Sequence, residues 1–178
     1  MNRLEAMRMV DHLSAKAVDV LKADGYHSMI VMLITPSGMQ IVGVQPVLEA
    51  VEEFHAAGRH ADADAAMDRA ADAVRAAAKA IGAFGFILVS EVWTLRRQPS
   101  IIGGDEPGLG GIERPRFAPD RVEALSLAWE FVAEDAGRIS GSRTWEFSRR
   151  PGKEDEIAEV GPPHDIEGQA GGRFSNIV

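Results

Sequence analysis

The feature that most constrains the fold is a nearly unbroken apolar run over residues 83–95, which reads Ala-Phe-Gly-Phe-Ile-Leu-Val-Ser-Glu-Val-Trp-Thr-Leu. Hydrophobic residues occupy both parities of this run, which is typical of a strand that is buried on both faces of its sheet. The run is too short for a membrane helix, which needs about 20 apolar residues. We therefore expect a central strand in the core of a sheet.

Apolar periodicity elsewhere predicts the remaining elements. A spacing of three and four residues predicts helices over residues 3–24, 46–57 and 61–81. Apolar or alternating runs predict strands over residues 28–35, 39–44, 84–95, 121–133 and 138–147. The short turn sequences at 36–38 and 134–137 imply antiparallel hairpins.

These elements predict an α+β fold for residues 1–148, as a single domain. We expect one mainly antiparallel five-stranded sheet with packed helices, in the order αββαβββ, with one helix or two between the second and third strands. Roadblock- and profilin-like folds have a similar order, and this analogy of fold implies no activity.

Residues 98–120 are rich in Gly and Pro and are expected to form a long flexible loop. Residues 149–178 are expected to be a disordered tail. The clean alternation over 138–147 predicts a strand near the edge of the sheet.

Charge and composition limit the classes of function. The chain has 178 residues and a net charge of -8, which disfavours binding to nucleic acid or to anionic membranes. It has no cysteine, so it has no disulfide, thiolate metal site or cysteine nucleophile. Glu5 and Asp11 interrupt the N-terminal segment, which therefore does not read as a signal peptide. We expect a cytoplasmic protein.

Neither a cofactor nor a metal ion is expected from the sequence. Residues 103–111 are rich in glycine but lack the Lys-Ser/Thr ending of a phosphate loop, and they carry two acids that would repel phosphate. His55 and His60 are five residues apart, a spacing that does not place them on one helix face. The serines show no nucleophile motif.

Glu91 is the carboxylate inside the apolar run, and it allows two interpretations. A desolvated and unpaired carboxylate would have a raised pKa and could act as a general acid or base. The alternative is a structural role, in which the strand end is exposed at Glu91 or Glu91 forms an ion pair with Arg96, Arg121 or Arg143. The catalytic candidates are therefore weak; they are Glu91, Asp120 and Arg121.

A possible binding site lies at the open end of a hairpin formed by residues 84–95 and 121–133. Such a hairpin would gather charged residues there, namely Glu91, Arg96, Arg97, Asp120, Arg121 and Glu123. Trp93 would form the floor of the pocket. A cross-strand set of salt bridges is the alternative. The binding candidates are Trp93, Arg96, Arg97, Glu123 and Trp145, the last as a core or interface anchor.

Two short motifs resemble those of a group of small bacterial and phage proteins without a known activity. The first is Val-Ser-Glu-Val-Trp at 89–93, and the second is Pro-Asp-Arg-Val-Glu-Ala at 119–124. The group carries a Ser-Glu-Ala-Trp strand and an Asp-Arg-x-Glu-Ala strand, so this chain departs from it at Val92 and in its Gly-rich insert. The resemblance covers roughly residues 28–148 and implies no functional residue.

The function expected from the sequence is a non-enzymatic binding or assembly module that associates with itself or with another protein. A strand edge that looks exposed, tryptophans on several strands and the lack of a catalytic motif favour it. One alternative is a small enzyme or small-ligand binder that uses Glu91 with Asp120 and Arg121. A further alternative is a phage or virion accessory protein, which rests on the resemblance alone.

Overall fold

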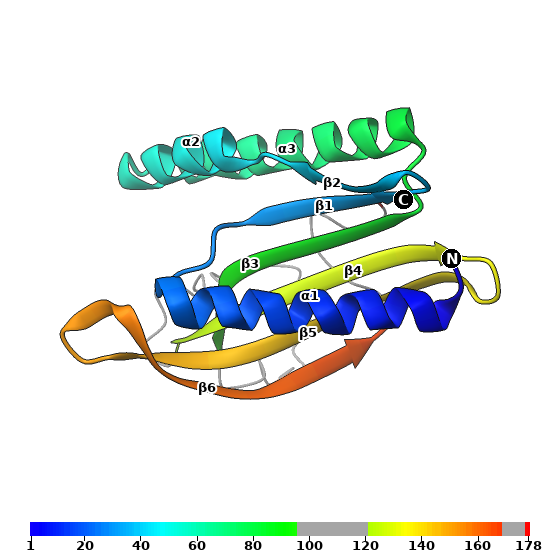
Figure 1. Ribbon diagram of the computed structural model, residues 1–178. Coiled ribbons are helices and arrows are strands. Elements are labelled where there is room, and N and C mark those ends of the chain that lie inside the picture. Colours follow the sequence, from blue (N-terminus) through cyan, green and yellow to red (C-terminus); the bar gives the residue numbers. More distant parts are fainter. Residues whose placement is uncertain (96–120, 169–176) are drawn as a thin grey trace, which may run out of the picture.

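The computed structural model describes residues 1–95, 121–168 and 177–178 (Figure 1). Its helices are α1 (Arg3–Asp24), α2 (Gln45–Ala56) and α3 (His60–Ile81). Its strands are β1 (Ile30–Thr35), β2 (Gly38–Val42), β3 (Gly85–Leu95), β4 (Arg121–Ala133), β5 (Gly137–Arg150) and β6 (Lys153–Glu167). All of these strands pair antiparallel in one sheet of order β2-β1-β3-β4-β5-β6.

The predicted α+β class with one antiparallel sheet is confirmed, whereas the strand count and the order of elements are wrong. The sheet has six strands instead of five, and the observed order is αββααββββ, because a further strand follows the last one predicted. The additional strand, β6, lies within the predicted tail 149–178. Its charged and proline-rich sequence lacks the apolar pattern typical of a strand. Backbone pairing with β5 nevertheless places it at the edge of the sheet. The segment 138–147 therefore belongs to the second strand from the edge. The predicted loop 98–120 lies outside the described residues.

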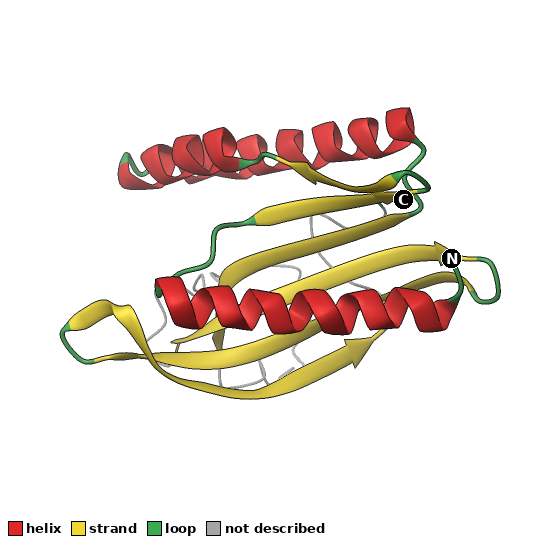
Figure 2. Ribbon diagram, viewed as in Figure 1, coloured by secondary structure: helices red, strands yellow, loops and turns green. Residues whose placement is uncertain are grey.

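Helices cover both faces of the sheet, which explains why β1 is apolar at both parities. Met32 and Ile34 of β1 pack in a core beneath α1, together with the bulky residues of β4. Val31 and Leu33 point to the other face and pack against α3. Figure 2 shows α1 running along β4 and β5, while α2 and α3 lie at the β1–β2 end of the sheet. No described helix is long and apolar enough to cross a membrane.

Two glycines make room for aromatic rings beneath α1. Gly141 on β5 is paired with Trp129 on β4, and a Cβ atom at Gly141 would lie 2.5 Å from the Trp129 ring. Gly85 on β3 is paired with Phe131, whose ring would lie 2.3 Å from a Cβ atom there. Each ring thus lies over the glycine of the neighbouring strand, a close approach that only glycine permits.

The helix α1 has a well-defined cap at each end. Asn2 and Glu5 form a capping box at its N-terminus, in which each side chain accepts a hydrogen bond from the other residue's backbone N–H. Gly25 ends the helix in the left-handed conformation, with φ 75°, and donates its N–H to the Leu21 carbonyl. A Cβ atom at Gly25 would lie only 1.8 Å from the backbone oxygen of Asp155 on β6. The end of α1 therefore packs directly against the β5–β6 hairpin.

Candidate functional site

Glu91 belongs to an ion-pair network that we call the Arg149 cluster, formed by Glu91, Glu123, Arg149, Gly25 and His27. Arg149 Nη2 lies 3.0 Å from Glu91 Oε2, and Arg149 Nε lies 3.0 Å from Glu123 Oε2. Arg149 Nη1 also donates to the Gly25 carbonyl, and the His27 backbone N–H donates to Glu91 Oε1. The side chains of Glu91 and Arg149 are only 28% and 19% exposed. The cluster therefore joins β3, β4 and β5 to the segment that follows α1.

The contacts of Glu91 favour the structural interpretation over the catalytic one. Both carboxylate oxygens accept hydrogen bonds from fixed donors, Arg149 and the His27 amide, as expected for a structural ion pair rather than for an unpaired general base. The partner differs from all three arginines expected from the sequence. Arg149 was missed because the strand was expected to end at 147, whereas β5 continues to Arg150. Side chains alternate between the two faces along a strand, so the extension of β5 places Arg149 on the same face of the sheet as Glu91.

Most of the other predicted site residues, or their side chains, lie outside the described part of the chain. The hairpin of β3 and β4 is confirmed, because Leu95 pairs with Arg121 and Trp93 pairs with Glu123. The side chains of Trp93 and Arg121, and the whole of Arg96, Arg97 and Asp120, lie outside the described residues. Trp145, which was expected as a core or interface anchor, is 6% exposed and belongs to the core beneath α1.

A second ion-pair cluster, centred on Arg143, joins α1 to the edge strand β6. The guanidinium makes a bidentate contact with Asp165, at 2.7 Å for each of two N–O pairs. Its Nη1 atom also lies 2.8 Å from Asp11 Oδ1 on α1. The pKa of Asp165 lies below its ordinary value, because Arg143 donates hydrogen bonds to the charged carboxylate. This cluster stabilises β6 in its place at the sheet edge.

The contact between Asp165 and Arg143 predicts a pH dependence of stability. Because the folded pKa of Asp165 is lowered, its contribution is present above about pH 4 and is lost as the pH falls through the folded pKa. We expect Asp165→Asn to lower the free energy of unfolding at pH 7 by less than about 1 kcal/mol, since the carboxylate is 45% exposed. The difference from the parent chain should shrink as the pH falls from about 5 to about 3.

Urea unfolding at several pH values would measure this difference. The matched control is Asp19→Asn, a change at an exposed carboxylate on α1. A difference between the parent chain and Asp165→Asn that stays constant down to pH 3 would contradict the prediction.

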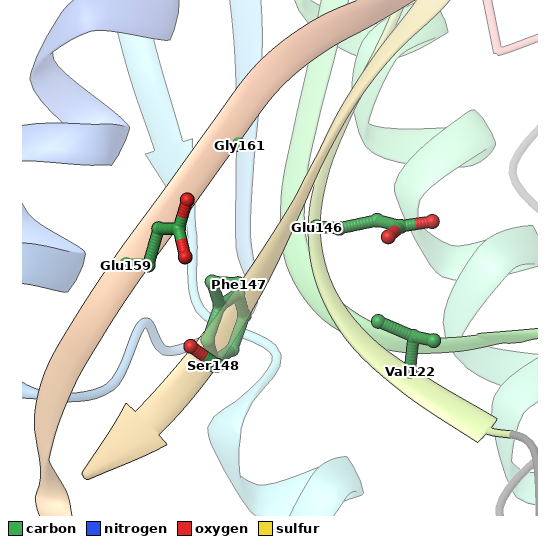
Figure 3. A pocket seen from close by; sticks show the side chains of 6 residues that line it. All are labelled: Val122, Glu146, Phe147, Ser148, Glu159 and Gly161. Carbon is green, nitrogen blue, oxygen red and sulfur yellow. The ribbon is translucent and has the colours of Figure 1, made fainter.

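A surface cavity of about 260 Å³ lies where β4, β5 and β6 meet (Figure 3). Its lining includes two carboxylates, Glu146 and Glu159, together with Val122, Phe147, Ser148 and Gly161. Figure 3 shows Glu159 above Phe147 and Ser148, and it shows Glu146 pointing away from Glu159. The two carboxylates therefore do not converge on one point, as a pair of catalytic carboxylates or metal ligands would.

The pair His55 and His60 was not expected to meet, but the structure brings the two rings together. α2 ends at Ala56 and α3 begins at His60, so the chain reverses between them. The two Nδ1 atoms lie 2.9 Å apart and share a hydrogen bond. Among the described residues, no group of three or more His, Asp or Glu side chains could hold a metal ion.

The most exposed apolar element of the sheet is its edge strand β2. We call its five residues, Gly38–Val42, the β2 edge. Met39 is 49% exposed and Ile41 is 66% exposed. β2 pairs with β1 on one side, and on the other side it has no neighbouring strand within the described part of the chain. Sequence analysis predicted a strand over 39–44 but not its place at the edge of the sheet.

Comparison with known proteins assigns no family to this chain. Searches against family models, curated proteins and solved structures found no significant match. The resemblance carried by residues 89–93 and 119–124 stays a prediction. Function is therefore inferred from the geometry of the described residues.

Proposed function

We propose that this protein is a non-enzymatic assembly module that self-associates through the β2 edge. The observation that supports this proposal is an edge strand that is exposed, apolar and uncharged. Its sequence, Gly-Met-Gln-Ile-Val, contains no charged residue and no proline. A sheet edge presents unpaired backbone N–H and C=O groups, so a strand of this composition is a template for pairing with another chain.

The opposite edge of the sheet supports the proposal by contrast. β6 carries the features that normally protect an edge against pairing, including the prolines Pro162 and Pro163, the charge of Lys153 and several acids. Its register with β5 is also irregular, with shifts near Trp145 and Arg149. β2 pairs with β1 in an unbroken register and has none of these features. Among the described strands, one edge thus carries these protective features and the other does not.

The side chains of the β2 edge extend an apolar surface that is already present in the sheet. Met39 and Ile41 pair with Ile34 and Met32 of β1, whose side chains belong to the core beneath α1. The apolar row therefore continues from the core to the outer edge of the sheet. Burial of such exposed side chains by a partner strand would stabilise the complex by about 25 cal/mol for each Å² of apolar surface removed from water.

The enzyme alternative has less support. It depended on an unpaired Glu91, and the carboxylate oxygens of Glu91 are occupied by Arg149 and by the His27 amide. The cavity lined by Glu146 and Glu159 does not bring its two acids together. The assembly proposal uses residues whose exposure is shown.

The test is a charge placed on the β2 edge. We expect the parent chain to self-associate with a dissociation constant in the micromolar range, because a single strand pair buries a small area. Ile41→Lys should abolish the association, since it would place an unpaired ammonium in the contact. Size-exclusion chromatography with light scattering, over concentrations from about 5 to 200 µM, would measure the mass.

Ile166→Lys is the matched control, because Ile166 is 64% exposed on the other edge strand. It should associate as the parent chain does. A parent chain that remains strictly monomeric over the whole concentration range would refute the proposed function.

A further inference from the structure

We infer that the strand bound by the β2 edge is β2 of a second copy, paired antiparallel about a twofold axis that passes beside Gln40. This inference rests on the proposed function and specifies its partner, symmetry and register. The result would be a closed dimer with one continuous sheet across two chains. The alternative is a head-to-tail contact between β2 of one copy and β6 of the next, which would continue without limit as a filament.

Charge and backbone chemistry favour β2 over β6 as the partner strand. The chain has a net charge of -8, so two copies repel each other at most approaches. The β2 edge contains no charged residue, and a contact between two such edges adds no like-charge pair. In β6, Pro162 and Pro163 have no backbone N–H to donate, and the neighbouring acids would be desolvated. A contact between β2 and β6 is therefore disfavoured.

The symmetry of an antiparallel pair restricts the register. Residues that lie directly opposite each other in a sheet point to the same face, and a residue and its symmetry mate also share a face. The twofold axis must therefore pass beside a residue and its own copy, because neighbouring residues point to opposite faces. Centring the pair on Gln40 matches all of Gly38–Val42 with residues of the partner strand. Centring it on Ile41 would match only Gln40, Ile41 and Val42 within the strand.

The chosen register also matches side chains of the same kind. Met39 lies opposite Ile41 of the second copy, and Ile41 lies opposite its Met39, so both exposed apolar residues of each chain are covered on the face that carries α1. Gln40 lies opposite its own copy on the other face. The amide of glutamine has both donors and an acceptor, so two such side chains can bond to each other. The β2 edge is therefore self-complementary on both faces.

Single cysteines test the register directly, because the chain has no cysteine of its own. In an antiparallel pair, opposite Cα atoms lie about 4.5–5.5 Å apart, which is within the range of a disulfide. Diagonal neighbours lie about 7–8 Å apart, which exceeds that range. We expect mild oxidation to convert most of the Gln40→Cys protein, and little of the Met39→Cys or Ile41→Cys protein, to a cross-linked dimer on a non-reducing gel. Ile166→Cys on β6 reports random collisions and should cross-link least.

The outcomes separate this inference from the proposed function. Light scattering of the parent chain should reach twice the mass of one chain and stop there. Preferred cross-linking of Met39→Cys or Ile41→Cys would overturn the register while self-association through the β2 edge stands. A mass that keeps rising with concentration would overturn the closed dimer. A monomer without preferred cross-linking at any β2 position would refute both proposals.

Discussion

Replacing Gly25 by alanine is expected to lower the free energy of unfolding by about 3 kcal/mol or more. Two costs add at this position. The left-handed conformation, with φ 75°, is unfavourable for alanine by about 1 kcal/mol. The new Cβ atom would also lie 1.8 Å from the backbone oxygen of Asp155, so either α1 or the β5–β6 hairpin must shift. A shift there would also disturb the contact between Arg149 and the Gly25 carbonyl.

Gly58→Ala is a matched control for this experiment. Gly58 also has a left-handed backbone, with φ 72°, but a Cβ atom there would meet no other atom within 4 Å. It should therefore lose only the conformational cost of about 1 kcal/mol. Urea unfolding followed by circular dichroism would give both values. Equal losses for Gly25→Ala and Gly58→Ala would show that the close approach to Asp155 is not important for stability.

Replacing Arg149 by methionine is expected to lower the free energy of unfolding by about 2–3 kcal/mol. Methionine keeps much of the apolar volume of arginine but leaves Glu91 and Glu123 without their cation. These two side chains are 28% and 25% exposed, so water compensates their charges only in part. Loss of one partner from a partly buried ion pair costs more than the pair contributes when intact, because a desolvated charge remains.

The neighbouring residue supplies the control for Arg149→Met. Arg150 pairs with Glu156, but its side chain is 59% exposed. Arg150→Met should cost less than about 1 kcal/mol, as for other surface ion pairs. The additional change Glu91→Gln should restore part of the stability lost in Arg149→Met, because it removes one uncompensated charge. If Arg149→Met and Arg150→Met were equally stable, the Arg149 cluster would have no special role in holding α1 to the sheet.

Strong local patterns made much of the fold predictable. The apolar segments 28–35 and 84–95 form β1 and β3 with nearly the expected bounds, because both have helices on each side of the sheet. The strand predicted over 121–133 is β4, whose alternate bulky residues pack in the core beneath α1. β6 was not predictable, since a polar edge strand buries little apolar surface and is held by backbone hydrogen bonds that carry no side-chain signal.

The candidate sites, like the fold, were predictable from the sequence only in part. The prediction that Glu91 lies within a buried strand beside an arginine is supported, but its partner Arg149 is 58 residues away in the sequence and meets it only through sheet pairing. The β2 edge could be recognised as uncharged from its sequence. Its exposure could not, because a strand of five residues reads alike at an edge and in the middle of a sheet.

The sequence by itself determined the α+β class, the positions of the helices and the five apolar or alternating strands, because these depend on the periodicity of neighbouring side chains. The tertiary structure decided which strands are outermost, that Arg149 and Arg143 hold α1 against the sheet, and that Met39 and Ile41 face solvent. Strand order depends on pairing between residues that are distant in the chain, and the local periodicity of side chains does not specify it. The exposure of the β2 edge is therefore a property of the folded sheet.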